Sequence, residues 1–380
     1  MTAFPSTIHD PRSTIHDTAF LQHAIRIGTR HLGRCWPNPS VGCVLVKDGQ
    51  VLAAAATAET GRPHAETQTL AAAGDRAKGA TCYTTLEPCS HTGVTPPCAE
   101  ALIQAGVARV VVGAMDHDAR VSGKGIAMLK SAGIEVTELF LPEAARLHRG
   151  FFRRVKSGLP EVLMKIATSA DGQMADPTGQ QRWVTGEQAR AHGHSIRNRV
   201  DAVLTGIGSV LADDPLLNVR LPGVQHLRGV RVVADRTLRI PLESQLVRGA
   251  NMQPTWVMTT PEGVEGAASH AADLRERGVK LLVVDGGLTP LAMLKALAAE
   301  GITRVLVEAG PRLSNAFLKA QAVDRLYWYK APTLLGITGN PAGAALDTAL
   351  IEAAGHRHHT TLTLGPDRCE VIEYQSCLPD

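Results

Sequence analysis

The sequence predicts two α/β domains that meet near residue 158. The chain has 380 residues, which is long for a single domain. In both halves, apolar runs of strand length alternate with segments of helical periodicity, a pattern typical of sheets with parallel pairs. Gly158-Leu159-Pro160 interrupts this alternation. Hydrophobic residues at 44% and charged residues at 20% fit an ordinary globular protein.

The first 16 residues predict a flexible leader. They hold one copy of the sequence Ser-Thr-Ile-His-Asp at Ser6–Asp10 and most of a second at Ser13–Asp17. Two polar copies cannot bury a core, so no packed element is expected before Asp17.

Residues 17–145 predict the first domain. A helix begins at Asp17 and ends near Gly33, and Asp48-Gly49 is a hairpin turn. The expected strands are Val41–Val46, Val51–Ala56, Thr81–Thr85, Ala108–Gly113 and Ile134–Glu138, and the expected helices are His64–Ala73, Pro97–Ala105 and Gly125–Ser131. A helix over Leu141–Ser157, basic near its end, leads into the second domain, and residues 146–160 serve as the linker.

Residues 161–380 predict a second α/β pattern without an internal repeat of the first. The expected strands are Val162–Thr168, Ala202–Thr205, Val230–Asp235, Thr255–Thr259, Lys280–Val284, Arg304–Glu308 and Arg325–Lys330, with helices over Glu187–Asn198, Pro290–Glu300 and Leu313–Gln321. A final strand is expected at either Thr360–Leu364 or Glu370–Tyr374.

Net charge and composition limit the classes of binding partner that we expect. A net charge of +3 suits small anionic ligands, and an aromatic content of 4% speaks against a base-stacking surface for nucleic acid. Seven scattered cysteines do not suggest a disulfide framework, and the N-terminus lacks a secretory signal pattern. The apolar runs are shorter than the roughly 20 residues of a membrane span. We therefore expect a cytoplasmic protein with no membrane or nucleic-acid partner.

Three short elements predict a catalytic zinc site: His64-Ala65-Glu66, Pro88-Cys89 and Cys98. One His and two Cys as ligands, with a Glu that does not touch the metal, is the pattern of zinc deaminases. Zinc takes about four ligands, so three side chains leave one position for water. Glu66 lies in the same predicted first turn as His64, where it could move protons to and from that water.

The alternative is a closed zinc site that only stabilises the fold. Such a site needs a fourth Cys or His nearby. Cys82 lies within a predicted strand, and His91 is better placed beside a substrate pocket. Eight residues separate Cys89 from Cys98, where the generic deaminase signature has two.

Longer motifs resemble one family. They are Pro37–Gly42, His64–Glu66, Thr85–Cys98, Lys165–Gly172, Trp183–Thr185, Leu211–Pro215 and Val307–Pro311. Together they are similar to the bifunctional riboflavin-biosynthesis deaminase–reductases over nearly the whole chain beyond the leader. The resemblance implies a cytidine-deaminase-like three-layer α/β/α domain followed by a dihydrofolate-reductase-like α/β domain. It implies zinc-dependent deamination of 2,5-diamino-6-ribosylamino-4(3H)-pyrimidinone 5-phosphate, then reduction of the ribosyl group to ribityl with NADPH, usually in a homo-oligomer.

The resemblance also implies roles for individual residues. Asn38 would contact the pyrimidine in the first domain. In the second, the substrate would meet Gln181, Arg197, Leu217, Arg220 and Glu308. The cofactor would meet Ala167, Trp183, Ser209, Asp213, Gly310, Pro311, Arg312, Leu313 and Ser314. The reductase proton donor is expected among Lys165, Asp213 and Glu308. Because no Gly-x-Gly-x-x-Gly fingerprint is present, the preference for NADPH rests on the resemblance alone.

Four positions depart from the family pattern, and one of them, Ala170 in place of a frequent Leu, changes packing more than chemistry. Val94 replaces a usual Lys or Arg, Gln181 replaces a common Ser, and Arg236 replaces a small residue near the cofactor, where it could pair with the extra phosphate of NADPH. Val94 and Gln181 leave open that only one activity is intact. Two other interpretations remain: a nucleoside or tRNA-adenosine deaminase with an unrelated C-terminal domain, and a zinc-stabilised binding module without catalysis.

Overall fold

The computed structural model describes residues 11–92, 96–119, 121–174, 183–224, 228–336, 346–353 and 355–374. The chain forms two compact units, Met1–Lys156 and Ser157–Asp380. Val94 and Gln181 lie outside the described residues. No helix in the described part of the chain is both long enough and apolar enough to cross a membrane.

The first helix, α1 (Pro11–Thr29), begins six residues before the predicted start at Asp17. The expectation of a flexible leader is therefore wrong for residues 11–16. Pro11 suits the first position of a helix. Asp17 is buried, accepts a hydrogen bond of 2.7 Å from the Tyr83 hydroxyl and pairs with Arg109 at 2.7 Å. These contacts tie this part of α1 to the sheet, and the local sequence does not reveal them.

In the part of the first unit that the structure describes, five strands form a sheet in the order β2-β1-β3-β4-β5. They are β1 (Gly42–Lys47), β2 (Gln50–Ala56), β3 (Thr81–Thr84), β4 (Arg109–Val112) and β5 (Glu135–Glu138). β1 runs antiparallel to both of its neighbours, as the Asp48-Gly49 turn predicts, whereas β3, β4 and β5 are parallel.

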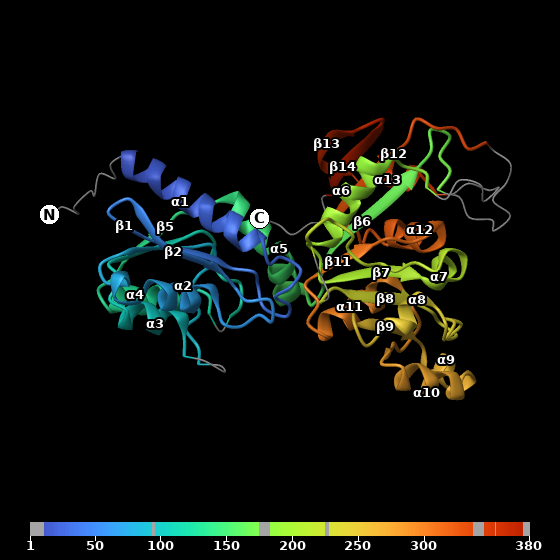
Figure 1. Cartoon of the computed structure of the whole chain (residues 1–380), viewed down its shortest axis with the longest axis horizontal. Coiled ribbons are helices and arrows are strands. Elements are labelled where there is room, and N and C mark those ends of the chain that lie inside the picture. The colour runs from blue at the N-terminus through green and yellow to red at the C-terminus, as the bar shows by residue number, and fades with distance from the viewer. Residues whose placement is uncertain are drawn as a thin grey trace. The chain divides into compact units, whose positions relative to one another are not determined.

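Helices cover both faces of this sheet, which gives the predicted three layers. They are α1, α2 (Ala65–Ala73), the short 3-10 helix η1 (Gly74–Ala77), α3 (Cys98–Gln104), α4 (Lys124–Ser131) and α5 (Pro142–Ser157). α1 lies on one face, and α2, α3 and α4 lie on the other (Figure 1). Leu21 and Ala24 of α1 pack against Val44 and Val111 of the sheet. The loops that enter α2 and α3 carry the predicted metal ligands.

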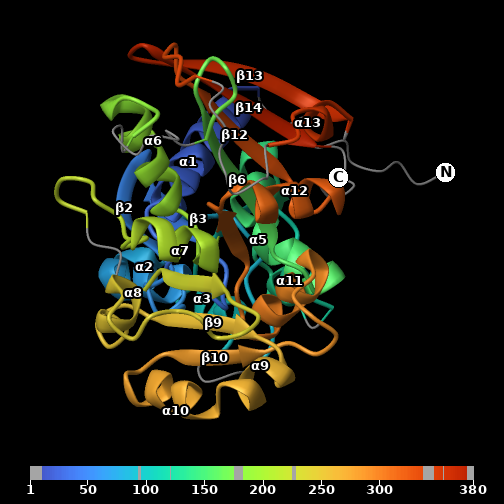
Figure 2. The same ribbon diagram turned by 90° about the vertical axis from the view of Figure 1, so that its right-hand side faces the viewer.

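Within the described residues, nine strands form the sheet of the second unit, in the order β10-β9-β8-β7-β11-β6-β12-β14-β13. Figure 2 shows β9 and β10 at one end of this sheet and β13 and β14 at the other. They are β6 (Glu161–Thr168), β7 (Ala202–Gly206), β8 (Val230–Ala234), β9 (Thr255–Thr259), β10 (Lys280–Val283), β11 (Arg304–Val307), β12 (Arg325–Lys330), β13 (His356–Leu364) and β14 (Asp367–Tyr374). The pairs from β10 to β12 are parallel, and β12, β14 and β13 pair antiparallel.

The predicted helices of the second unit are α6 (Glu187–Arg197), α11 (Pro290–Ala299) and α12 (Pro311–Lys319), and others escaped prediction. Those are α7 (Ile207–Asp213), α8 (Gln245–Arg248), α9 (Pro261–Gly266), α10 (Ala268–Glu276) and α13 (Ala349–Ala353). Most are short, so they give little periodic signal. The two alternatives for a final strand both form, as the hairpin β13–β14, because Gly365 turns with a φ of 67°.

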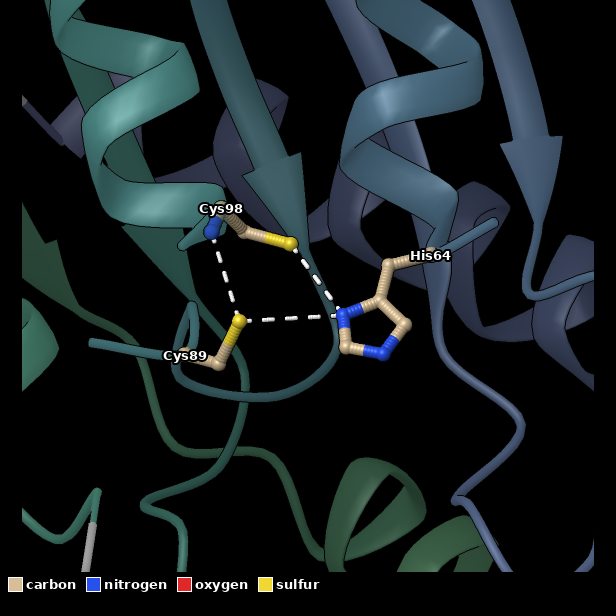
Figure 3. Close-up of side chains that lie close together, drawn as sticks. All are labelled: His64, Cys89 and Cys98. Atoms are coloured by element: carbon tan, nitrogen blue, oxygen red, sulfur yellow. Dashed lines mark hydrogen bonds between the residues drawn. The ribbon is translucent and has the colours of Figure 1, made fainter. Parts of the chain in front are cut away.

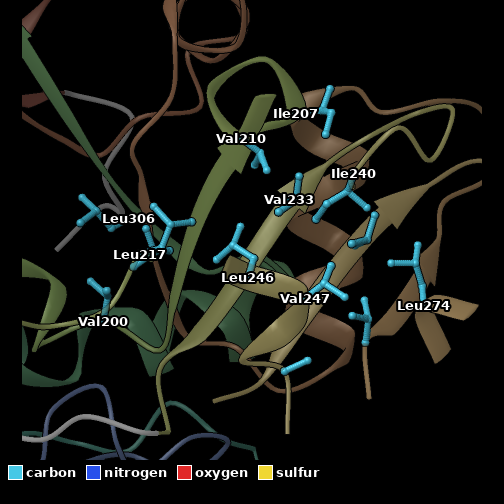
Figure 4. Packing of buried hydrophobic residues seen from close by; sticks show 14 of the residues in the cluster. Val200, Ile207, Val210, Leu217, Val233, Ile240, Leu246, Val247, Leu274 and Leu306 are labelled. Carbon is cyan, nitrogen blue, oxygen red and sulfur yellow. The ribbon is translucent and has the colours of Figure 1, made fainter. Parts of the chain in front are cut away.

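The core of the second unit lies between this sheet and its helices. Val233, Leu246, Val247 and Leu274 are fully or almost fully buried within one cluster (Figure 4). Its members come from strands, helices and loops, and Leu217, which the resemblance assigned to the substrate, is one of them, with 6% exposure. This packing fixes the parallel strands whose carboxyl ends carry the second candidate site.

Candidate active sites

The metal ligands predicted in the first unit converge. One ligand atom each from His64, Cys89 and Cys98 lies within 4.8 Å of the other two (Figure 3). His64 Nδ1 is 3.3 Å from Cys98 Sγ and 3.7 Å from Cys89 Sγ. Zinc bonded to sulfur at about 2.3 Å and to nitrogen at about 2.0 Å in a tetrahedron would separate these atoms by about 3.6 Å. The donor set and its spacing therefore fit zinc.

Two of the ligands are placed by helix starts. His64 is the N-cap residue of α2, and Cys98 is the first residue of α3, after Pro97 at its N-cap. The backbone N–H of Cys98 donates to Cys89 Sγ at 3.3 Å. N–H groups at a helix start favour an anion.

The interaction between the two sulfurs shifts their pKa values in opposite directions. The hydrogen bond from the Cys98 thiol, with those from His64 and the Cys98 N–H, lowers the pKa of Cys89 to about 4. The same interaction with Cys89 raises the pKa of Cys98. Metal binding needs both as thiolates, so loading of the site releases protons.

Glu66 is 3% exposed and lies in the first turn of α2. Burial raises its pKa, which favours a carboxyl that can both take and return a proton. The Thr84 hydroxyl, at the end of β3, lies 3.2 Å from Glu66 Oε1 and 3.1 Å from the Leu86 carbonyl oxygen. Thr84 was not predicted from the sequence. Its position at the carboxyl end of β3, directly before the Thr85–Cys98 motif, is the feature that could have indicated it.

A fourth protein ligand does not appear among the described residues, where the cluster holds these three side chains only. Cys82 instead contacts Cys43, with 3.5 Å between the two sulfurs. This favours the predicted open site over a closed structural one. Asn38 is partly buried and donates from Nδ2 to the Gly61 carbonyl at 3.0 Å, and its contact with the pyrimidine stays a prediction.

A second cluster lies at the carboxyl ends of β6 and β11 in the second unit. Arg197 of α6 forms two hydrogen bonds with the Glu308 carboxylate, of which the Nη2–Oε2 bond is 2.8 Å. Lys165 Nζ lies 4.0 Å from Glu308 Oε2. The strand register explains this contact. Val307 of β11 pairs with Met164 of β6, and Glu308 and Lys165 are the residues that follow them.

Burial and charge set the protonation of this cluster. Burial opposes ionisation of Glu308, but Arg197 outweighs it and holds the pKa of Glu308 at about 2. Burial lowers the pKa of Lys165, with Glu308 opposing. His194, one turn before Arg197 on α6, has its pKa lowered to about 4 by burial and by Arg197. His194 was not predicted as a site residue, although its i,i+3 spacing places it on the same face of the helix as Arg197.

Residues 217–220 lie against the same helix. Arg197 donates from Nη1 to the Asn218 carbonyl at 3.0 Å, and the Arg220 N–H donates to His194 Nδ1 at 3.4 Å. Leu217 holds a left-handed φ of 48°. Arg197, Arg220 and Glu308 are thus linked through these contacts, and their contacts with substrate stay a prediction.

The residues predicted for the cofactor are more widely spread. Gly310 is the N-cap of α12, followed by Pro311, Arg312, Leu313 and the buried Ser314, and a Cβ on Gly310 would lie 3.7 Å from Ser209 Oγ. Ala167 lies in β6, and Asp213 ends α7. Trp183 is 47% exposed, with the Arg190 guanidinium 5.5 Å from its ring centre. Their contacts with a cofactor stay predictions.

Comparisons with known proteins agree with both sites. Residues 14–114 match the model of the cytidine and deoxycytidylate deaminase zinc-binding region, and residues 160–358 match the RibD C-terminal domain. The riboflavin biosynthesis protein RibD of Escherichia coli is 39% identical over 341 residues, which are 85% of this chain and 89% of that protein.

Two solved structures extend the similarity to the whole fold. Acinetobacter baumannii RibD superposes with a TM-score of 0.82 at 37% identity, over 96% of this chain and 100% of that one. The deaminase/reductase of Thermotoga maritima gives 0.80 at 29% identity, over 95% and 99%. The match of the second unit to the RibD C-terminal domain does not favour a deaminase with an unrelated C-terminal domain. The chain belongs to the RibD family of bifunctional riboflavin-biosynthesis enzymes.

Proposed function

We propose that the first unit deaminates 2,5-diamino-6-ribosylamino-4(3H)-pyrimidinone 5-phosphate and that the second reduces the ribosyl group of the product to ribityl with NADPH. The convergence of His64, Cys89 and Cys98 beside the buried Glu66 carries this proposal. The Thermotoga maritima relative is described as a diaminohydroxyphosphoribosylaminopyrimidine deaminase and 5-amino-6-(5-phosphoribosylamino)uracil reductase. Assembly as a homo-oligomer and a cytoplasmic location stay predictions.

In the deaminase site, His64, Cys89 and Cys98 would hold zinc, and the bound ion would lower the pKa of a water in its open position towards about 7. Glu66 takes a proton from the attacking water as its oxygen bonds to the amino-bearing carbon. It then returns a proton to the ring nitrogen and helps to protonate the departing amine, so that water is consumed and ammonia released. Thr84 keeps the Glu66 carboxyl oriented from the side of β3.

In the reductase site, bound NADPH would be the source of the hydride that C1′ of the ribosyl group accepts. The bond between C1′ and the ring oxygen breaks, and that oxygen needs a proton. We assign this proton to Lys165, because Glu308 is ionised at neutral pH whereas burial brings the pKa of Lys165 down from its usual range. Glu308 orients Lys165, and Arg197 holds Glu308.

The substrate phosphate requires a cation. The guanidinium of Arg197 is committed to Glu308 and to the Asn218 carbonyl. We therefore assign the phosphate to Arg220, whose exposed guanidinium donates from Nη1 to Asn218 Oδ1 at 2.9 Å. A guanidinium matches phosphate geometry with two parallel hydrogen bonds. Arg236 follows β8 on an exposed position and stays the candidate for the extra phosphate of NADPH.

A coupled assay tests both steps. The substrate is incubated with the enzyme with and without NADPH, and ammonia release and NADPH consumption are followed separately. Ammonia release without NADPH, followed by NADPH consumption only after deamination, supports the proposal. Glu66→Gln should retain zinc and lose ammonia release; surviving turnover would exclude Glu66 as the proton carrier, whereas a zinc-stabilised binding module would show no turnover in the wild type.

Lys165→Met separates the two sites. It should abolish NADPH consumption and leave ammonia release unchanged. Lys280→Met is the matched control. Lys280 lies on the edge strand β10, its side chain is 44% exposed, and it pairs with Glu300 after α11. Reduction at the wild-type rate in Lys165→Met would remove Lys165 from the role of proton donor.

A further inference from the structure

Glu87 is a buried carboxylate that the mechanism above does not use. It lies two residues before Cys89 and is 3% exposed. Its Oε2 accepts hydrogen bonds from the backbone N–H groups of Asp116 at 3.4 Å and Gly123 at 2.9 Å. Its Oε1 accepts those of Gly125 at 3.0 Å and Ile126 at 3.3 Å. All four donors belong to one segment, residues 116–126, far from Glu87 in sequence.

This segment ends in the first turn of α4 (Lys124–Ser131), where Gly125 and Ile126 are the second and third residues. The first N–H groups of a helix have no partner within the helix, and they favour a negative charge. The Glu87 carboxylate supplies both the acceptors and the charge. A second contact reinforces the first: a Cβ on Gly125 would lie 2.0 Å from the Pro88 carbonyl oxygen. The chain is thus fixed to α4 at the two residues that precede Cys89.

Cys89 needs such support more than the other two ligands. His64 and Cys98 are held by the starts of α2 and α3, whereas Cys89 lies in an irregular segment after β3. Beyond the Glu87 carboxylate, the Ala99 N–H donates to the Cys89 carbonyl oxygen at 3.2 Å, and the Glu87 N–H donates to the Ala114 carbonyl oxygen at 2.9 Å. The Cys98 N–H also donates to Cys89 Sγ at 3.3 Å. The position of its sulfur therefore depends on how firmly residues 86–88 are held.

We propose that Glu87 is a positioning residue for the metal centre. It fixes the peptide that leads to Cys89 against the start of α4, and so keeps Cys89 Sγ facing His64 and Cys98. Outer-shell partners of metal ligands change metal affinity by about 10- to 100-fold when they are removed. The inference rests on the zinc site of the proposed function, and its consequence is slow release of the metal.

Glu87→Gln is the direct test in the zinc-loaded full-length enzyme. The substitution keeps size and shape but replaces one oxygen by an amide NH₂. Because each oxygen accepts two N–H groups, either orientation of the amide sets donor against donor. We expect zinc transfer to a chromogenic chelator at pH 7 to become at least about tenfold faster. In the cobalt-substituted enzyme, the visible absorption bands should shift, which a loss of stability alone would not cause.

Asp17→Asn is the matched control. Asp17 is also a buried carboxylate of this unit, but its side chain pairs with Tyr83 and Arg109, neither of which is a metal ligand. It should destabilise the unit and leave zinc release and the cobalt spectrum unchanged. Equal release from both variants would overturn the proposal in favour of general loosening, and so would release from Glu87→Gln at the wild-type rate.

One outcome distinguishes failure of the proposed function from failure of the positioning role. If the wild-type enzyme binds no zinc, the metal site itself is wrong, whatever Glu87 does. Glu87→Asp replaces Glu87→Gln in the test where the latter does not fold. It keeps the negative charge, but its side chain is shorter by one methylene group and places the carboxylate farther from the N–H groups. Release faster than wild type supports the positioning role, and the wild-type rate overturns it.

Discussion

Arg197→Met would leave a buried carboxylate in the reductase site without its main partner. Glu308 has its pKa held at about 2, against an ordinary 4.5, although burial works in the opposite direction. That difference corresponds to about 3 kcal/mol of stabilisation at neutral pH. Removal of one partner of a buried ion pair usually costs about 3–5 kcal/mol. Lys165, at 4.0 Å, compensates only in part. We therefore expect the second unit to lose about 3 kcal/mol of unfolding free energy at pH 7.

The pH dependence gives this prediction its sign. A carboxyl with a depressed pKa stabilises the folded state above its unfolded pKa, and the wild type loses that stabilisation as the pH falls from 4.5 towards 2. In Arg197→Met, burial instead raises the pKa of Glu308. The variant therefore takes up a proton on acidification while the wild type stays ionised, so the difference between them should shrink from pH 7 to pH 4.5.

Urea unfolding followed by tryptophan fluorescence measures this effect, since three of the four tryptophans lie in the second unit: Trp183, Trp256 and Trp328. The double variant Arg197→Met/Glu308→Gln should recover most of the stability, because no uncompensated charge remains. Arg304→Met breaks the buried pair with Glu161, which lies at the amino ends of β11 and β6, and should spare the KM for substrate. A loss in Arg197→Met that is independent of pH, or undiminished in the double variant, would refute the reasoning.

Three further predictions concern the first unit. Removal of zinc with a chelator should stop ammonia release while NADPH-dependent reduction of the deaminated substrate continues, measured as two rates on one sample. Thr84→Val removes a hydrogen bond to Glu66, at a cost of about 1.5–3 kcal/mol, so kcat for deamination should fall about tenfold to hundredfold with little change in KM, and Thr84→Ser should restore it. Gly61→Ala would place a Cβ 2.5 Å from Asn38 Nδ2 and should raise KM for deamination. Gly49→Ala is the control, because Gly49 has a similar positive φ with open space around it. An equal rise in KM in Gly49→Ala would argue against a role for Asn38.

The sequence predicted the first site well because its parts are local. His64 and Glu66 share one helical turn, and Cys89 and Cys98 share one motif, so their chemistry can be read without knowing the fold. The start of α1 could not be predicted in the same way, because the contacts of Asp17 come from β3 and β4. Thr84 and Glu87 escaped for the same reason: their partners are distant in sequence, and neither residue type indicates its partner.

The second site shows the opposite relation between sequence and geometry. Lys165 and Glu308 are separated by most of the second unit, so no spacing rule connects them, and only the resemblance suggested that they act together. The structure supplies the cause, since the parallel register of β6 and β11 places the residues after Met164 and Val307 side by side. The two sites should therefore respond differently to change. The metal centre depends on loop anchors such as Glu87, so single polar substitutions should loosen it. The reductase cluster depends on strand register, so it should fail when the sheet or the Arg197–Glu308 pair is broken.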